Sequence, residues 1–313
     1  MTTYNGERFL QEQLDSFLWQ TRLPDELVVC DDGSTDRTLE ILEAFAQKAP
    51  FPVRIYRNPQ RLGFSKNFEK AALMCSGELI AFSDQDDVWL LEKLQLVEEA
   101  FRKNPDISLC FHDNYVCNEN FDKTFYRMWD HYKKATPDFQ KNYLYFLKDM
   151  SFQGNCLVIN NALISIAFPI PSGWAYDQWI PFISILNYPP FFIDKPLIKY
   201  RIHPGQTTHH KPMENNLKKI LKCINKKNIE KFYNSRYNKW LFAINCYKKN
   251  YKYNVYIDIN NKIALIENMI KSSLKNKIIN IIRFYIKGFY HRYELGARIM
   301  VRDLLFTFLL NCK

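Results

Sequence analysis

Short apolar runs alternate with helical patterns through the first 113 residues. The runs lie at residues 26–31, 53–57, 78–83 and 107–112. Segments between them repeat apolar residues at helical spacing. Strands that alternate with helices are typical of βαβ units, in which helices cover both faces of a sheet. We therefore expect an α/β fold with a mostly parallel sheet.

Four helices are expected in this alternation, at residues 9–18, 39–45, 64–75 and 88–103. Asn5 is positioned to cap the first of them, and Ser34 or Thr35 the second, because short polar side chains favour helix N-termini. Beyond residue 113 the pattern loosens. It then predicts a strand at residues 152–159, a helix at 177–186 and a strand at 197–202.

Charge divides the chain near residue 210. Residues 1–210 carry a net charge of −6 and residues 211–313 a net charge of +16. We expect two parts, an α/β domain over residues 1–210 and a basic α-helical appendage over residues 211–313. A basic amphipathic appendage favours contact with an anionic membrane surface. The alternative is a solvated helical bundle, in which the bias towards Lys, Asn, Ile and Tyr reflects AT-rich coding.

Several compositional features favour a cytoplasmic protein. Its apolar stretches fall short of the roughly 18 to 20 residues that span a bilayer, and no signal peptide opens the chain. The eight cysteines show no CxxC spacing, so disulfides and structural zinc are not expected. Together with the basic appendage, this predicts a cytoplasmic protein with peripheral contact at the inner face of the cell membrane.

Carboxylates follow two of the predicted strands. Asp32 lies in the sequence DDGSTD directly after the first run, where an open α/β sheet binds ligands. Its carboxylate could accept hydrogen bonds from a base or a ribose. The alternative is a plain strand-to-helix turn, with Ser34 or Asp36 as the helix cap.

The second acidic cluster is SDQDD at residues 83–87. Asp84, Asp86 and Asp87 repel one another, and a divalent cation would offset that cost. Mg²⁺ or Mn²⁺ prefers such oxygen ligands together with substrate phosphates. The alternative is a helix start before Trp89, where the carboxylates would complement the helix dipole.

Four segments in this order resemble the inverting glycosyltransferases of family 2, and among them the rhamnosyltransferase-like enzymes of polysaccharide biosynthesis. They are TYNG (3–6), DDGSTD (31–36), RLGFSKN (61–67) and FSDQDDVW (82–89), and the resemblance covers about residues 2–205. It implies the GT-A fold, Rossmann-like with helices on both faces, and sugar transfer from a nucleoside diphosphate to an acceptor hydroxyl. It also implies a divalent metal, Mn²⁺ or Mg²⁺.

The resemblance also implies functional roles for the residues of this chain that match the family's motifs. It implies nucleotide-sugar contacts at Thr3, Tyr4, Asp32, Lys66 and Asp84, with Asp32 near the base and Asp84 near the ribose. It further implies that Asp86 binds the metal, with Asp87 as a weaker candidate, and that His203 in the late motif YRIH reaches the diphosphate or the metal. For His203 the alternative is an ordinary structural histidine.

The segment GWAYDQW (173–179) resembles the family's acidic base motif and makes Asp177 the expected general base. An N-cap role for Asp177 is the alternative. Trp174 and Trp179 are expected on the acceptor side, although core packing would also explain them. Gly154 and Asn155 resemble the family's acceptor-side strand entry, and a simple bulge is their alternative.

Family members begin with an apolar strand before TYNG, whereas this chain begins at Met1. We therefore expect the first family strand to be missing, and we hypothesise that the natural start lies upstream. An absent central strand would expose sheet edges and remove core. An alternative function follows, in which an N-terminally truncated, inactive glycosyltransferase acts only as a binding protein.

The expected partners follow from this resemblance. They are a UDP- or dTDP-linked sugar donor and a lipid-linked or oligosaccharide acceptor of surface polysaccharide, with no nucleic acid. A nucleotidyltransferase is the rival enzyme, but the chain lacks a Gly-rich, Lys-containing phosphate loop near its amino terminus. A nucleic-acid binder would use the basic appendage, yet no recognised nucleic-acid module is present.

Overall fold

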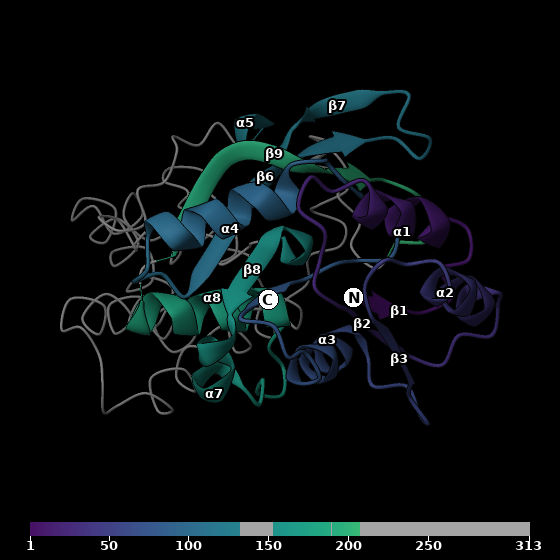
Figure 1. The fold of residues 1–313 in the computed structure, drawn as a ribbon, viewed down its shortest axis with the longest axis horizontal. Coiled ribbons are helices and arrows are strands. Elements are labelled where there is room, and N and C mark those ends of the chain that lie inside the picture. The colour runs from purple at the N-terminus through teal and green to yellow at the C-terminus, as the bar shows by residue number, and fades with distance from the viewer. Residues whose placement is uncertain (132–152, 189, 207–313) are drawn as a thin grey trace, which may run out of the picture. The chain divides into compact units, whose positions relative to one another are not determined.

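The computed structural model describes residues 1–131, 153–188 and 190–206 (Figure 1). All of them belong to one compact unit, formed by Met1–Lys141 and Ser151–His210. The expected basic appendage, residues 211–313, lies outside the described residues. Within the described ranges, no helix is both long and apolar enough to cross a bilayer.

The first sheet is parallel and has three strands in the order β1-β2-β3. Three helices alternate with its strands, as expected. The elements are β1 (Thr2–Thr3), α1 (Leu10–Leu18), β2 (Leu27–Asp31), α2 (Thr38–Ala46), β3 (Val53–Arg57) and α3 (Phe64–Leu73).

The central strand β2 is buried along its whole length because helices cover both of its faces. Leu27 and Val29 belong to an apolar cluster with Leu14 of α1 and Leu42 of α2. On the other side lies α3 (Figure 1), whose Asn67 donates a 2.8 Å hydrogen bond to the carbonyl of Cys30. Each fully buried leucine contributes about 1.5–3 kcal/mol, so this packing fixes the end of β2 firmly.

The amino terminus holds two residues of strand, Thr2–Thr3, at the place where we expected the apolar first strand of the family to be missing. Thr2 and Thr3 pair with Cys30 and Asp31 in parallel register. The Met1 amino group donates a 2.9 Å hydrogen bond to the carbonyl of Val28, and burial lowers the pKa of this amino group. Two residues of strand are thus enough to place the loop that follows β1.

The second sheet has the order β4-β8-β6-β9-β5, with β7 paired to β6. Among the described strands of this sheet, β6 and β9 pair in parallel and the other pairs are antiparallel. The strands are β4 (Leu79–Ala81), β5 (Val88–Trp89), β6 (Leu109–Cys117), β7 (Thr124–Arg127), β8 (Leu157–Asn160) and β9 (Phe191–Arg201). The mostly parallel sheet that we expected is therefore confined to the amino-terminal strands, and the full fold is mixed α/β.

The predicted helix over residues 88–103 is shorter than expected. Val88 and Trp89 form β5 against β9, and the helix α4 covers only Lys93–Lys103. Trp89 packs its ring edge-on against Phe17, with centroids 4.6 Å apart. A buried apolar pair suits a strand and a helix equally well, so periodicity alone misplaced this boundary.

The expected helix caps are also absent. The N-cap positions of α1 and α2 are Phe9 and Arg37, and neither makes a side-chain cap. Asn5 instead accepts a 2.9 Å hydrogen bond from the backbone N–H of Thr35. Asn5 therefore ties the two loops together, whereas Asp36 supports the start of α2 by accepting a 3.0 Å hydrogen bond from the backbone N–H of Thr38.

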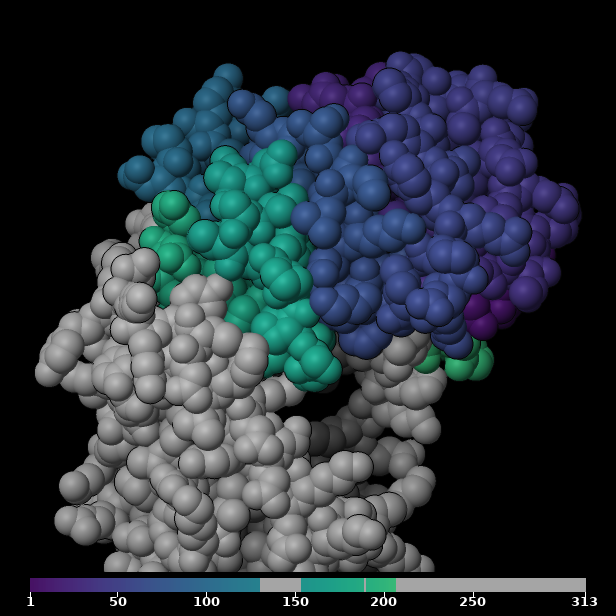
Figure 2. Space-filling view, turned by 90° about the horizontal axis from the view of Figure 1, so that it is seen from below, coloured from purple at the N-terminus to yellow at the C-terminus, as the bar shows by residue number. Residues whose placement is uncertain are grey.

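The carboxyl-terminal elements follow the expected order of strand, helix and strand. They are α5 (Met128–His131), a 3₁₀ turn (Gly154–Cys156), β8, a second 3₁₀ turn (Asn161–Leu163), α7 (Ile164–Ala167), α8 (Tyr176–Asn187) and β9. Figure 2 shows the teal surface of this part directly against the blue surface of the amino-terminal part. Ser65 and Lys66 bridge the two, with hydrogen bonds of 3.1 Å to the carbonyl of Trp174 and 2.8 Å to that of Ile170.

Candidate active site

Loops from the ends of β1, β2 and β3 meet at one edge of the first sheet, and the turn after β4 joins them. A 3.4 Å hydrogen bond from the backbone N–H of Thr2 to the carbonyl of Ser83 connects β1 with that turn. The carboxyl ends of strands in open α/β sheets are where ligands bind. The expected acidic motifs are therefore brought together where a ligand would lie.

Asp31 builds the loop after β2 and is fully buried. One of its carboxylate oxygens accepts hydrogen bonds from the backbone N–H groups of Gly33 and Ser34, at 3.1 and 2.9 Å. The other accepts from the hydroxyls of Thr3 and Ser34, at 2.9 and 2.5 Å. We expected Thr3 at the nucleotide sugar. In the structure its hydroxyl donates to Asp31, and its expected contact with the nucleotide sugar stays a prediction.

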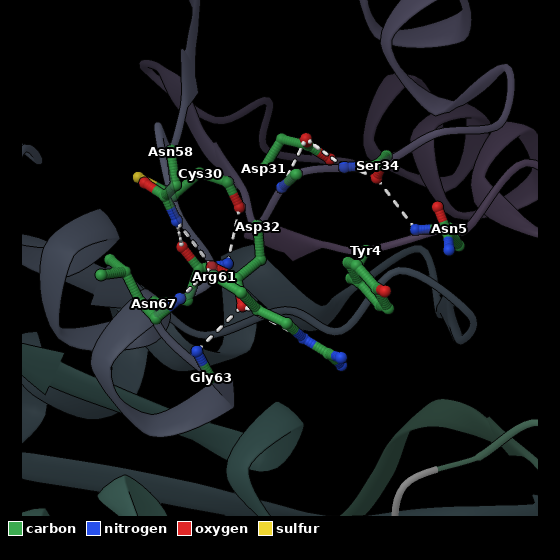
Figure 3. Close-up of polar contacts among 12 residues, drawn as sticks. Tyr4, Asn5, Cys30, Asp31, Asp32, Ser34, Asn58, Arg61, Gly63 and Asn67 are labelled. Atoms are coloured by element: carbon green, nitrogen blue, oxygen red, sulfur yellow. Dashed lines mark hydrogen bonds and ion pairs between the residues drawn. The ribbon is translucent and has the colours of Figure 1, made fainter.

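Asp32 lines a surface pocket of about 560 Å³ and organises the loop after β3. Its carboxylate accepts hydrogen bonds from the side chain of Asn58 at 2.9 Å and from the backbone N–H groups of Leu62 and Gly63 at 2.7 and 2.9 Å (Figure 3). A carboxylate held by three donors keeps one orientation. Asp32 is 4% exposed, so only a small part of its side chain is open to the pocket.

Tyr4 and Arg61 form the exposed part of the same pocket. The Arg61 guanidinium lies 3.8 Å from the centroid of the Tyr4 ring (Figure 3). Both groups are planar, and either can stack on an aromatic base. Sequence reasoning gave no role to Arg61, although it is the first residue of the RLGFSKN segment; its place beside Tyr4 depends on the tertiary fold.

Lys66 does not line the pocket. Its ammonium pairs with Glu69 at 2.8 Å and also donates to the carbonyl of Ile170. Glu69 in turn accepts a 2.7 Å hydrogen bond from the backbone N–H of Ile170. In the structure Lys66 therefore fastens α3 to residues 168–172, and its expected contact with the nucleotide sugar stays a prediction.

The acidic turn after β4 concentrates negative charge. Burial raises the pKa of Asp84 to about 7, and repulsion by Asp86 and then by Asp177 adds to this effect. Burial likewise raises the pKa of Asp87, with Asp86 and Asp84 as further causes. Asp177 is thus close enough to the turn to act on it electrostatically, although it is distant in the sequence.

Asp87 faces the interior and is 1% exposed. One carboxylate oxygen accepts from the side chain of Asn155, and the other accepts a 3.2 Å hydrogen bond from the backbone N–H of Arg201. The fully buried Lys93 lies nearby and donates a 2.9 Å hydrogen bond to the carbonyl of Asn155. Each oxygen of Asp87 thus accepts one hydrogen bond that holds the turn, and its role as a weaker metal candidate stays a prediction.

The end of β9 holds the other side of the turn. Arg201 is 1% exposed, and its Nε donates a 2.7 Å hydrogen bond to the carbonyl of Asp86. Its Nη2 pairs with Glu12 at 2.9 Å. His203 Nε2 lies 2.9 Å from Oδ2 of Asp86, so His203 reaches the expected metal ligand directly.

Asp177 lies in the first turn of α8, where a negative charge is favoured by the helix dipole. The N-cap is Ala175, so the N-cap alternative for Asp177 is wrong. Next to it the buried Tyr176 packs on Phe68 and Phe82, with centroids 4.1 and 5.2 Å away. This aromatic packing fixes the start of α8 and with it Asp177.

A close contact with Tyr176 explains why residue 154 is a glycine. A Cβ at this position would lie 1.7 Å from the hydroxyl of Tyr176 and 2.3 Å from its Cζ atom. The backbone of Gly154 therefore lies directly against the residue that precedes Asp177. Its neighbour Asn155 is buried against Asp87, so this strand entry contacts both the acidic turn and Tyr176, the residue before the expected base.

The two acceptor-side tryptophans are buried. Trp174 is 5% and Trp179 2% exposed, with ring centroids 5.1 Å apart. Trp179 Nε1 donates a 2.7 Å hydrogen bond to the carbonyl of Ala167. Core packing, the alternative reading, describes both rings in the structure, and neither presents an open face to a sugar.

The residues around Asp86 fit a divalent cation whose coordination would be completed by substrate phosphates. Asp86 is 19% exposed at its side chain and His203 11%, and the half-buried Asp84 lies in the same turn. No group of three or more His, Cys, Asp or Glu side chains in the described ranges forms a ready-made metal cluster. Mg²⁺ and Mn²⁺ sites at phosphates need only one or two protein carboxylates, so the donor set is sufficient.

Removing the charge of Asp84 is expected to stabilise the fold. The pKa of Asp84 is about 4 in the unfolded chain and about 7 in the folded protein. The folded protein therefore loses stability as the pH rises from about 4 through about 7 and this carboxyl ionises. Asp84→Asn cannot ionise, so its gain should be larger near pH 8 than near pH 5. The stabilisation is measured as the difference in melting temperature between Asp84→Asn and wild type at both pH values, without metal. An equal difference at the two pH values would contradict the raised pKa of Asp84.

The chain belongs to Glycosyl transferase family 2, whose sequence profile matches residues 1–165. The dTDP-rhamnosyl transferase RfbG of Shigella flexneri is 37% identical over 99 residues, 30% of this chain and 34% of that one. The chain spans about two fifths or less of the length of the first curated relatives that it matches. The family resemblance expected from the four segments is thereby confirmed.

Solved structures confirm the GT-A fold. TarS of S. aureus in complex with UDP-GlcNAc aligns with a TM-score of 0.59 and 18% identity, covering 91% of this chain and 79% of that one. The mannosyltransferase PcManGT of Pyrobaculum calidifontis, in complex with GDP-Man and Mn²⁺, gives a TM-score of 0.57 and 14% identity over 99% of this chain and 84% of that one.

Proposed function

We propose that this protein transfers a sugar, with inversion, from a nucleoside diphosphate donor to an acceptor hydroxyl. The observation that carries the proposal is the joint placement of three parts. They are the pocket of Tyr4, Asp32 and Arg61, the acidic turn at Asp84 and Asp86, and a further carboxylate, Asp177, near that turn. Membership of Glycosyl transferase family 2 supports the same reaction class.

The pocket of about 560 Å³ is the place for the nucleoside. Tyr4 and Arg61 offer planar groups to the base, and the fixed carboxylate of Asp32 accepts from a base N–H. A UDP- or dTDP-linked donor fits, since uracil and thymine both carry such an N–H. RfbG is a dTDP-rhamnosyl transferase and TarS binds UDP-GlcNAc, so relatives support each alternative.

The diphosphate lies at the acidic turn in this proposal. Asp86 and His203 would hold Mn²⁺ or Mg²⁺, and Asp84 would face the ribose. When bound, such an ion neutralises the charge that develops on the leaving diphosphate. Arg201 fixes the backbone of Asp86 from behind, so the protein supplies a rigid turn for the leaving group.

Asp177 is the general base in this proposal. It accepts the proton of the acceptor hydroxyl while that oxygen attacks the anomeric carbon. The bond from that carbon to the diphosphate oxygen breaks, and the nucleoside diphosphate leaves on the opposite face, which inverts the configuration. Asp86 and Asp177 both repel the charge on Asp84, so a cation bound in the turn would offset that repulsion.

The acceptor is proposed to be a lipid-linked or oligosaccharide intermediate of surface polysaccharide. The similarity to RfbG, a dTDP-rhamnosyl transferase, supports sugar transfer from a nucleoside diphosphate donor to such an acceptor. A lipid-linked acceptor places the reaction at the cytoplasmic face of the membrane. The net charge of +16 on residues 211–313 supports attraction to anionic lipids there.

The transfer reaction is tested with UDP- and dTDP-sugars and lipid-linked oligosaccharide acceptors, in the presence of Mn²⁺. Release of the nucleoside diphosphate together with a product of inverted anomeric configuration, read by NMR, is the expected result. A product of retained configuration would reject the mechanism. Binding of nucleotide sugar with no transfer to any acceptor would favour the alternative, a truncated glycosyltransferase that only binds.

A further inference from the structure

Gln85 lies between Asp84 and Asp86 in the acidic turn, and its side chain points to the loop after β1. Its Oε1 accepts a 2.8 Å hydrogen bond from the backbone N–H of Tyr4. Its Nε2 donates a 3.1 Å hydrogen bond to the carbonyl of the same residue. One amide thus holds both backbone polar groups of Tyr4, as a neighbouring strand would.

Gly6 makes room for this contact. A Cβ on Gly6 would lie 2.4 Å from Oε1 of Gln85 and 2.6 Å from its Cδ atom. The backbone N–H of Gly6 donates a 2.8 Å hydrogen bond to Thr38, which holds the loop at this close approach. Tyr4, Gly6 and Gln85 therefore form one packed unit across the two motifs.

Each of the two parts also has its own anchors. Asn5 ties the loop after β1 to the loop after β2, through Ser34 at 2.9 Å and Thr35 at 2.9 Å. Arg201 anchors the acidic turn through the carbonyl of Asp86. The pocket and the turn can thus each keep their shape without Gln85. Their relative position is held by Gln85 together with the hydrogen bonds to Ser83 from the backbone N–H of Thr2 at 3.4 Å and from the Gln13 side chain at 2.9 Å.

We propose that Gln85 is a positioning residue that sets the separation between the nucleoside pocket at Tyr4 and the metal-binding carboxylate of Asp86. This inference rests on the proposed function. A nucleoside diphosphate with its cation must engage both parts at once. A fixed separation lowers the cost of doing so, because the second contact then forms at high effective concentration.

The test compares three affinities in wild type and in Gln85→Ala. UDP in EDTA reports the pocket alone, Mn²⁺ without nucleotide reports the turn alone, and UDP with Mn²⁺ reports both together, with dTDP as a second probe. We expect the first two to change by less than about twofold and the third to weaken by about tenfold, a typical size for coupling between sites. Gln95→Ala, which removes an exposed glutamine of α4 that contacts Thr21 and Glu99, is the matched control.

Gly6→Ala gives a second, independent variant. Its new methyl group must displace the end of the Gln85 side chain, which is flexible, so the fold is expected to persist. Gly6→Ala should reproduce the tenfold loss, and the double variant with Gln85→Ala should be no worse than either single variant. Additive losses would show that Gly6 acts through something other than Gln85.

The outcomes separate this inference from the proposed function. If all three affinities fall together with the melting temperature, Gln85 is merely structural and the inference is overturned. The same holds if nucleotide with Mn²⁺ binds Gln85→Ala as it binds wild type. If wild type binds neither UDP nor dTDP, the proposed donor site itself is wrong and the inference falls with it.

Discussion

Asp177→Asn is expected to lower sugar transfer about 10²- to 10⁴-fold, the range that a general base contributes. Asparagine keeps the size and the place of the side chain in the first turn of α8 but cannot accept the acceptor proton. Donor binding should persist, because Asp177 acts on the acceptor hydroxyl.

The measurement is the rate of nucleoside diphosphate release together with nucleotide affinity in the same preparations. Asp25→Asn changes an exposed carboxylate that pairs with Arg22 and serves as the matched control. Turnover by Asp177→Asn within threefold of wild type would reject Asp177 as the base. Loss of donor binding alongside turnover would instead give Asp177 a role in the donor site.

Gly154→Ala is expected to destabilise the protein and to reduce its activity together. The added methyl group would lie 1.7 Å from the hydroxyl of Tyr176, whose ring is buried against Phe68 and Phe82 and cannot swing aside. Overpacking of this kind costs about 1–3 kcal/mol. Because Tyr176 precedes Asp177, the displaced ring would also move the start of α8.

Thermal unfolding and transfer rates of Gly154→Ala measure both effects. Gly77→Ala is the control, because its Cβ would meet only the carbonyl of Leu79, at 3.4 Å. Equal melting temperatures for Gly154→Ala and wild type would show that Tyr176 can move. The close approach would then not explain the glycine.

The sequence predicts much of the fold because local pattern decides the parallel layer. Strand β3 was predicted at the bounds it has, and β2 within one residue, since each is a run bounded by polar turns. The acidic segments were correctly placed after strands β2 and β4. These strands belong to different sheets, so a tertiary contact, the hydrogen bond from Thr2 to Ser83, is needed to join their ends. The order of motifs then supplied the family.

The remaining features depend on tertiary contacts that no local pattern carries. The antiparallel pairing of β5 with β9 joins residues more than a hundred positions apart. Trp174 and Trp179 are of a residue type that can stack on sugars, yet both are buried in the structure. In the sequence Gln85 only separates two aspartates of an acidic motif, and the fold alone shows that its amide meets Tyr4.

The central claim is a metal-dependent nucleotide site at Tyr4, Asp32 and Asp86. Thermal stabilisation by UDP, dTDP and GDP, with and without Mn²⁺, tests it most directly in wild type and Asp86→Ala. We predict that UDP or dTDP raises the melting temperature of wild type more strongly with Mn²⁺ than without it, and that Asp86→Ala loses this added gain. Stabilisation by none of the nucleotides, or an undiminished effect of Mn²⁺ in Asp86→Ala, would contradict the account.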